Sequence, residues 1–327
     1  MEKPLISVII PVYNPGVYLD SCLQSIQAQT YPNFEVILVD NGSTDGSAQR
    51  CDEWVRQDSH FRVIHQQNEG IIGGRGTGIR MSRGEYLAFV DSDDLIHPQM
   101  LEILIDSCLA ADIPCAGCGL VPFFGAVPAF KPLEHPACKC YPAPNHLDAL
   151  LHCNRMQYSL CNKLYHRSLF NGLSFDSKIM YNEDLFTNWT VLQHASGFVL
   201  VDFDGYFYRQ HTSSTSHKPP SDKLFSDQIS VAEFMRDSSK GTAMAASAWA
   251  FYYEKLLYLN SMILRRRNAK AYTGWHKILV HRLRKELFTA LISSELSSFM
   301  KLTAILSCFG GPFYRLLCRL FLTDRRE

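Results

Sequence analysis

Three carboxylates follow one another at the end of a short apolar segment. Residues 86–90 (YLAFV) are typical of a buried strand, and Asp91, Asp93 and Asp94 come directly after them. Neighbouring carboxylates disfavour one another's ionised form, so such a cluster needs a reason. Two explanations are open: a solvated turn, or a divalent cation held by the carboxylates, since hard cations prefer oxygen ligands.

The elements before this cluster alternate in their hydrophobic period. Short apolar segments predict strands and amphipathic segments predict helices. The strands are expected at 5–11, 34–39, 61–65 and 86–90, and the helices at 17–29, 43–58 and 71–82. Such an alternation predicts an α/β fold, with a mostly parallel central sheet covered by helices on both faces.

Polar side chains follow three of these predicted strands. Tyr13 and Asn14 follow the first, the segment 40–43 (DNGS) the second, and the segment 91–94 (DSDD) the fourth. Each alone would be an ordinary turn or helix cap. Ligands of parallel sheets bind beyond the carboxyl ends of the strands, so three such segments together predict a binding site.

Length and composition limit the domain organisation, the partners and the location that can be expected. The chain has 327 residues, 46% of them hydrophobic and 20% charged, which fits a large domain at 1–220 and a helical region at 221–327. The formal net charge is zero, and no nucleic-acid partner is expected. The N-terminus has no signal-peptide pattern and the cysteine count is odd, so we expect reduced thiols and a cytoplasmic location.

Two segments between residues 115 and 146 have an unusual composition, one in cysteine and one in proline. Cys115, Cys118, Cys138 and Cys140 are spaced like zinc ligands, but residues three apart on a strand point to opposite faces, so incidental cysteines are favoured. Residues 122–146 contain six prolines and predict a long loop.

Residues 221–327 read as helical throughout. Between Arg265 and Lys285 there are eight basic residues and no acidic one, and the apolar segment 296–322 is interrupted by charges. A basic face beside apolar helix is typical of binding at an anionic membrane surface, here the inner face of the cell membrane. A helical bundle that packs on the large domain, or on a second copy in a homo-oligomer, is the alternative.

Five separated motifs resemble the inverting family 2 glycosyltransferases of bacterial surface-polysaccharide type, which have the GT-A (Rossmann-like) fold. They are SVIIPVYN at 7–14, SIQAQTYPNFEVILVDNGSTDGS at 25–47, NEGIIGGRGTGIRMSRGEYLAFVDSDD at 68–94, CNKLYHRSLF at 161–170 and YNEDLF at 181–186. The resemblance covers residues 5–217 and does not extend with any force to the C-terminal third.

The resemblance implies roles for the residues that match its motifs. Asp91 and Asp93, with Ser92 between them, would be the DxD motif that holds Mn²⁺ or Mg²⁺ on the diphosphate of a nucleotide sugar. Other matching residues would bind the nucleotide sugar: Pro11, Tyr13, Asn14, Asp40 at the base, and Arg75. Asn41 stands where the common pattern has a second Asp, and Gly76 where it often has Asn.

Two further motif matches carry implied roles near the reaction centre. Glu183 and Asp184 would be the catalytic pair, with Asp184 as general base for the acceptor hydroxyl; two acids at a helix N-terminus are the ordinary alternative. Arg209 and His211 would lie in a loop that closes on the diphosphate or the metal.

The resulting hypothesis is a metal-dependent inverting glycosyltransferase. Its donor would be a nucleotide sugar, first of all a UDP-sugar, and its acceptor a glycan or lipid-linked saccharide. Two alternatives remain open: a degenerate relative that binds nucleotide sugar or glycan without turnover, and a nucleotidyltransferase. The sequence does not indicate the sugar, the acceptor or the linkage.

Overall fold

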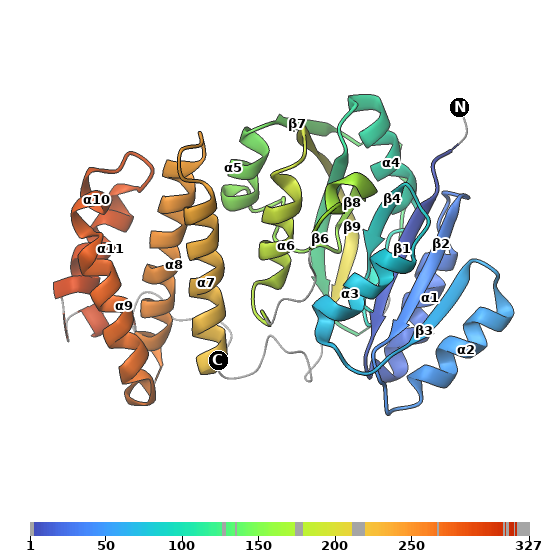
Figure 1. Cartoon of the computed structure of the whole chain (residues 1–327), viewed down its shortest axis with the longest axis horizontal. Coiled ribbons are helices and arrows are strands. Elements are labelled where there is room, and N and C mark those ends of the chain that lie inside the picture. Colours follow the sequence, from blue (N-terminus) through green and yellow to red (C-terminus); the bar gives the residue numbers. More distant parts are fainter. Residues whose placement is uncertain are drawn as a thin grey trace. The chain divides into compact units, whose positions relative to one another are not determined.

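The computed structural model describes residues 3–125, 129–134, 136–173, 179–210, 220–266, 268–309, 311, 314–316 and 318. The chain divides into two compact units, Met1–Lys218 and Pro219–Glu327. The first is an α/β unit and the second consists of helices (Figure 1).

One sheet organises the first unit. Its strand order is β3-β2-β1-β4-β8-β6-β9-β5, and β7 pairs with β9. The parallel part comprises β1 (Ile6–Val12), β2 (Phe34–Asp40), β3 (Phe61–His65) and β4 (Tyr86–Phe89). The remaining strands, joined through antiparallel pairs and the parallel pair β6–β9, are β5 (Leu95–Ile96), β6 (Cys115–Phe123), β7 (Cys138–Pro142), β8 (Lys163–His166) and β9 (Gly197–Arg209).

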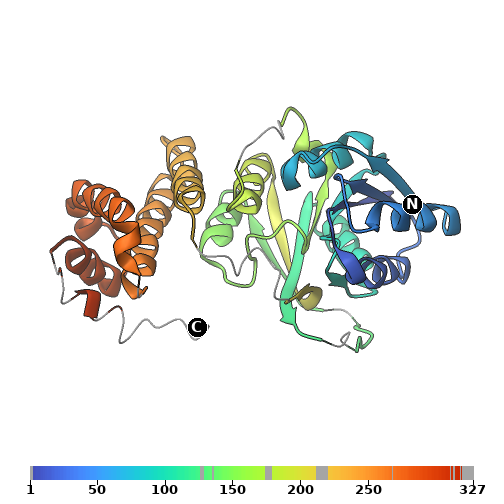
Figure 2. The ribbon, with the colours of Figure 1, turned by 90° about the horizontal axis from the view of Figure 1, so that it is seen from below.

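Helices cover both faces of this sheet (Figure 2). They are α1 (Leu19–Gln27), α2 (Ser47–Gln57), α3 (Gly70–Met81), α4 (Met100–Ala111), α5 (Asn145–His152) and α6 (Glu183–Leu192). Apolar residues at helical spacing give α1 its buried face, formed by Leu19, Cys22, Leu23 and Ile26. The expected α/β architecture is confirmed.

Small residues let α3 approach the sheet closely. A Cβ atom on Gly78 would lie within 3.0 Å of Cγ2 of Ile9, and one on Gly74 would lie 3.4 Å from Cβ of Pro11. Glycine is therefore needed at position 78 for close approach of helix and strand, and Pro11 lies buried beneath the helix. This packing also buries Arg75, whose side chain is 4% exposed.

A partly buried carboxylate ties the strands together away from their carboxyl ends. Glu35 of β2 accepts hydrogen bonds from Ser7 Oγ (2.7 Å) and Arg83 N (2.6 Å), and its other oxygen lies 2.9 Å from Arg62 Nη2. Burial alone would raise the pKa of Glu35, but these three partners outweigh it and lower the pKa.

The segment 122–146 is more ordered than its prolines suggested. Pro122 lies in β6, and Cys138–Pro142 forms the strand β7, so the prediction of one long loop is wrong. Both prolines are tolerated because they lie near strand ends, where ladder hydrogen bonds can be omitted. Residues 126–128 and 135 lie outside the described residues.

The cysteines with zinc-like spacing are divided between two environments. Cys115 and Cys118 are buried in β6, with their thiols on the carbonyls of Gly197 and Asn162, whereas Cys138 and Cys140 are exposed on β7. In the described part of the chain, no three His, Cys, Asp or Glu residues are grouped so that they could hold a metal ion.

The second unit is built around one long helix. Its helices are α7 (Asp222–Ser238), α8 (Ala245–Arg265), α9 (Thr273–Lys285), α10 (Leu287–Ile292) and α11 (Ser298–Phe309). α8 contacts α7, α9 and α11 and buries a largely apolar side, including Leu256, Leu259 and Ile263. Within the described residues, none of the helices has the length and apolar character needed to cross a membrane.

Candidate functional site

The carboxyl ends of β1, β2 and β4 meet at one edge of the sheet. Val12 pairs with Asp40 and Ile9 pairs with Phe89, so the segments that follow these strands lie beside one another. Tyr13 and Asn14, the turn after Asp40, and Asp91–Asp94 are thereby gathered at the same edge, where parallel sheets bind ligands.

The loops after β1 and β2 are fastened to each other. Asn14 has a positive φ of 51°, and its Oδ1 accepts a hydrogen bond from Thr44 N at 2.7 Å. The backbone N–H of Gly16 donates to Asp45 Oδ2 at 2.8 Å. Tyr13 is 53% exposed on this surface. The two loops thus form one rigid wall with an exposed aromatic side chain.

Asp40 ends β2 with a nearly buried carboxylate. Its Oδ1 accepts a hydrogen bond from Ser43 N at 3.0 Å, and its Oδ2 lies 2.9 Å from His65 Nδ1. The other ring nitrogen of His65 lies 3.1 Å from Asp52 Oδ1. These two carboxylates raise the pKa of His65 above its ordinary value.

Asn41 uses all of its hydrogen-bonding capacity inside the chain. Its amide nitrogen donates to Asn68 Oδ1 (3.2 Å) and to the carbonyl of Gly70 (3.0 Å). Its Oδ1 accepts from Gln66 Nε2 (2.9 Å) and Glu69 N (3.0 Å). Two donors and two acceptors are all that a primary amide offers. The side chain fastens β2 to the start of α3, and any pairing of its amide with a nucleobase would cost these bonds.

Arg75 joins the two halves of the site. Its Nη1 lies 2.5 Å from Asp184 Oδ1, and its Nη2 lies 3.2 Å from Asp91 Oδ1. Burial alone would lower the pKa of Arg75, but the two carboxylates outweigh it and raise the pKa, so the guanidinium stays charged. The residue expected near the base or diphosphate therefore links the aspartate motif to the acidic pair on α6.

The turn after β4 is organised by its third carboxylate, which points inward. Asp94 is fully buried, and its oxygens accept hydrogen bonds from Tyr206 Oη (2.6 Å) and Arg209 N (2.8 Å). Burial, with the carboxylates of Asp91 and Asp93 nearby, raises the pKa of Asp94 to about 8. Both oxygens of Asp94 are therefore bonded to residues of β9.

Arg209 lies beneath the same turn. Its guanidinium is sandwiched between the rings of Tyr18 (4.8 Å) and Phe123 (4.7 Å). Its Nε donates to the backbone carbonyl of Asp93 at 2.7 Å and its Nη2 to Ser21 Oγ at 3.1 Å. At 6% exposure Arg209 supports the turn from within. His211 lies outside the described residues.

The acidic pair begins α6. Asn182, with a φ of 64°, precedes Glu183 and Asp184 in the first turn. Burial and the adjacent Asp184 carboxylate raise the pKa of Glu183 to about 7. The second oxygen of Asp184 accepts a hydrogen bond from Leu160 N at 3.3 Å, so this carboxylate is held from two sides.

The donor set after β4 suits a cation that substrate completes. Both oxygens of Asp94 are hydrogen-bonded to β9, so the cation ligands to consider in this turn are the carboxylates of Asp91 and Asp93. Ser92, which lies between them, is buried. Burial raises the pKa of Asp91, although the charge of Arg75 opposes the rise. A cation bound beside Asp91 would lower this pKa and so favour the ionised carboxylate. Mg²⁺ binds proteins through one or two carboxylates together with substrate phosphates, and the residues present fit that requirement.

Two residues of the site were missed from the sequence. Tyr206 donates to Asp94 and accepts from Asp91 N at 3.2 Å, bridging both ends of the turn. The buried Lys163 donates to the carbonyls of Gln157 (3.0 Å) and Ser159 (2.6 Å), and burial lowers its pKa to about 8. Lys163 lies in the motif CNKLYHRSLF at 161–170, which was a signal for it, whereas nothing in the local sequence marked Tyr206.

The chain is similar to known glycosyltransferases over most of its length. The family model described as Glycosyl transferase family 2 matches residues 7–174. The putative glycosyltransferase EpsH of Bacillus subtilis (strain 168) is 32% identical over 251 residues, which is 73% of this chain and 72% of EpsH. The uncharacterized glycosyltransferase EpsJ of the same organism is 31% identical over 220 residues, which is 66% of this chain and 64% of EpsJ.

Solved structures agree with this relationship at the level of the fold. The S. aureus TarS 1-349 structure aligns with a TM-score of 0.70 at 17% identity, covering 96% of this chain and 90% of TarS 1-349. The same protein has been solved in complex with UDP-GlcNAc. The likeness confirms the expected GT-A fold. Together with the motifs, the family match establishes that this chain belongs to glycosyl transferase family 2.

Proposed function

We propose that this chain transfers a sugar from a nucleotide diphosphate donor to a hydroxyl group of a glycan or lipid-linked saccharide, with inversion at the sugar. Residues 1–220 would form the catalytic domain and residues 221–327 an accessory helical region. The observation that carries the proposal is the buried Arg75 bridge, which fixes Asp184 beside the aspartate turn.

A UDP-sugar is the donor we favour. The S. aureus TarS structure with UDP-GlcNAc, which shares the fold, supports this choice. In this chain the base would lie near Asp40 and the exposed ring of Tyr13, at the wall formed by the loops after β1 and β2.

Asp91 and Asp93 would hold Mn²⁺ or Mg²⁺ together with the donor diphosphate. When bound, the cation would neutralise charge that develops on the leaving nucleoside diphosphate. A mannosyltransferase from Pyrobaculum calidifontis, with a TM-score of 0.52, has been solved with GDP-Man and Mn²⁺, which supports metal use in this fold. Arg209, Tyr206 and Asp94 would keep the turn in shape from behind.

Asp184 would be the general base. An inverting transfer is a single displacement, and it needs one group that takes the proton of the acceptor hydroxyl. Arg75 Nη1 and the backbone N–H of Leu160 hold the Asp184 carboxylate from two sides, so it would be positioned to take that proton. Glu183, whose pKa is raised to about 7, would be partly protonated at neutral pH and would stand beside Asp184 in the first turn of α6.

The second unit would bind at a membrane surface. Exposed apolar residues on α11 recur every three or four positions and so share one face of the helix: Phe299, Leu302, Ile305 and Phe309. Phe288 and Ile292 of α10 are also exposed, at 76% and 67%. With the basic segment 265–285 nearby in sequence, this composition suits an anionic lipid surface.

Hydrolysis of the donor in the absence of acceptor tests the proposed chemistry. Wild-type protein with Mn²⁺ should release UDP slowly from a UDP-sugar. Asp184→Asn should lower this rate by about 10²–10⁴-fold while leaving UDP binding intact, because the amide oxygen can still accept from Arg75 but cannot take the proton. Glu183→Gln serves as the matched control and should be milder. Tight nucleotide binding without any turnover by the wild type would favour a binding protein instead.

Sedimentation with vesicles tests the membrane proposal. Phe299→Glu should weaken binding to vesicles that contain anionic lipid, because it places a charge in the apolar face of α11. Leu109→Glu, at a 53% exposed position on α4 in the first unit, is the control and should sediment like the wild type. If Phe299→Glu changes the oligomeric state and leaves sedimentation unaltered, the surface joins two copies of the chain.

A further inference from the structure

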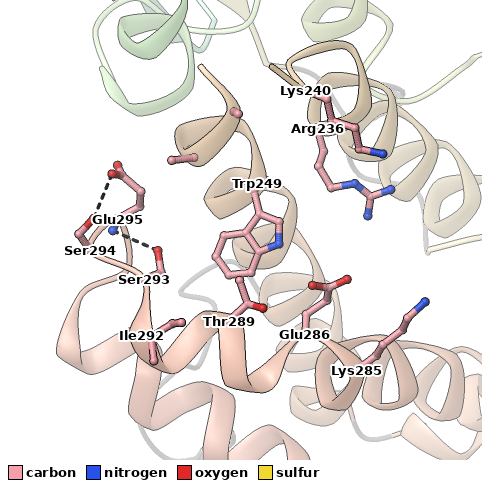
Figure 3. Close-up of a pocket in the computed structure, with 12 residues that line it drawn as sticks. Arg236, Lys240, Trp249, Lys285, Glu286, Thr289, Ile292, Ser293, Ser294 and Glu295 are labelled. Atoms are coloured by element: carbon pink, nitrogen blue, oxygen red, sulfur yellow. Dashed lines mark hydrogen bonds between the residues drawn. The ribbon is translucent and has the colours of Figure 1, made fainter. Parts of the chain in front are cut away.

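A cavity of about 790 Å³ opens within the helical unit (Figure 3). Trp249 of α8 stands at its centre, with Arg236 of α7 and Lys240 just beyond that helix on one side and the segment 285–295 on the other. The volume is in the range that holds small-molecule ligands. The cavity shares no residue with the site at the end of β4.

Trp249 is a supported aromatic platform. Its ring stacks on that of Tyr253, with centroids 5.5 Å apart and an interplanar angle of 21°. Tyr253 is itself fully buried, and its hydroxyl donates to the carbonyl of Leu283 at 3.2 Å. The indole is therefore held from one side, and it is only half-buried. A rigid, partly exposed aromatic face is suited to stacking against a flat apolar surface of a ligand.

The rim of the cavity mixes charges of both signs with hydroxyl groups. Arg236 and Lys240 are both fixed by Asp237, at 2.9 Å each, and Lys285 lies beyond them. Carboxylates at Glu286 and Glu295, and hydroxyls at Thr289 and Ser293, complete the rim. Donors and acceptors thus surround the indole together.

This combination selects a class of ligand. A phosphate would be repelled by the carboxylates of Glu286 and Glu295, and a cationic ligand by Arg236, Lys240 and Lys285. An apolar ligand would remove water from the charged groups of both signs and offer them no hydrogen bond in return. A sugar ring offers hydroxyls that both donate and accept, and an apolar face of C–H groups.

We propose that this cavity binds a neutral saccharide, with one sugar ring stacked on Trp249 and its hydroxyls bonded to the rim. The binding does not depend on the proposed reaction. If the chain is a glycosyltransferase as proposed, the bound saccharide would be part of the acceptor glycan, and this role alone rests on the proposed function.

The test is binding of the full chain, without nucleotide or metal, to an immobilised panel of oligosaccharides. The panel contains neutral oligosaccharides of glucose, galactose, mannose or N-acetylglucosamine, with uronate-containing oligosaccharides alongside. At least one neutral oligosaccharide should bind, and Trp249→Ala should weaken it by about tenfold or more, because the stacking platform is lost. Thr289→Tyr fills the cavity, leaves Trp249 in place, and should weaken binding as well.

Two controls separate this inference from the proposed function. Tyr258→Ala removes a half-exposed aromatic from the same helix outside the cavity, and should bind like the wild type. Asp93→Ala should also keep saccharide binding, although we expect it to lose nucleotide. The inference is overturned if no neutral oligosaccharide binds, if both cavity variants bind like the wild type, or if the uronate oligosaccharides are preferred.

Discussion

Replacing Arg75 by methionine would remove the charge that joins the two acidic halves of the site. The Arg75 side chain is 4% exposed, whereas those of its partners Asp184 and Asp91 are 23% and 36% exposed. Methionine fills much of the same volume and keeps the helix, so packing of α3 on the sheet would change little. The loss would be chiefly electrostatic, with two carboxylates left close together and uncompensated.

The expected cost follows from this geometry. Removing one partner of a buried ion pair costs about 3–5 kcal/mol. Because both carboxylates are partly reached by water, which screens them, we expect the lower end, about 3 kcal/mol. For a unit of the size of Met1–Lys218, such a loss lowers the melting temperature by about 6–12 °C.

Thermal and urea unfolding of Arg75→Met, Arg75→Lys and the double variant Arg75→Met/Asp184→Asn would measure this cost. Lysine keeps the charge but, as a single ammonium group, cannot bridge both carboxylates in the same way, so intermediate stability with poor donor hydrolysis is expected. The double variant should regain part of the stability, because one uncompensated charge is gone. If Arg75→Met melts within about 2 °C of the wild type, or the double variant is no more stable than the single one, the reasoning is refuted.

Three further predictions concern the scaffold of the site. Gly78→Ala should cost about 1–3 kcal/mol in urea unfolding by overpacking against Ile9, whereas Gly274→Ala, with nothing within 4 Å of its Cβ, should cost nothing. Glu35→Gln should be less stable than the wild type by about 1–3 kcal/mol at neutral pH. Since the folded-state pKa of Glu35 is lowered, this difference should be complete above the ordinary glutamate pKa and disappear as the pH falls through the folded value, which a pH series of unfolding curves would show. Asn41→Asp should destabilise by about 1–3 kcal/mol and weaken nucleotide binding measured by calorimetry, because a carboxylate cannot donate to the two oxygens that hold the start of α3.

The regular parts of the first unit were predictable because their signals are local. Hydrophobic period alone indicated β3 at its observed bounds and β1, β2, β4 and α3 within one or two residues. The gathering of polar segments at one edge then follows from the rule for parallel sheets.

The buried contacts of Arg209 and Asn41 could not be predicted from the sequence, because each involves residues that are distant in the chain. The sandwich around Arg209 is formed by Tyr18 and Phe123, which are remote from it in the chain. The four bonds of Asn41 depend on the path of the loop before α3. A motif indicates that such residues matter at the site, whereas the folded chain decides whether they face the ligand or the interior.

The strand β7 was missed for a different reason. Prolines normally end regular structure, and they dominate this segment. A short edge strand needs few ladder bonds and tolerates a proline at its end, so β7 forms on β9 in spite of its composition.

Calorimetric binding of UDP, GDP, CDP and dTDP to the wild type and to Asp93→Ala, each with Mn²⁺ and with a chelator, would show whether the aspartate turn holds the donor through a metal ion. We predict that one nucleotide, UDP first, binds the wild type only when metal is present, and that Asp93→Ala loses this binding while keeping its fold. Binding that ignores both the metal and Asp93, or no binding at all, would contradict the assignment of the aspartate turn as the donor site.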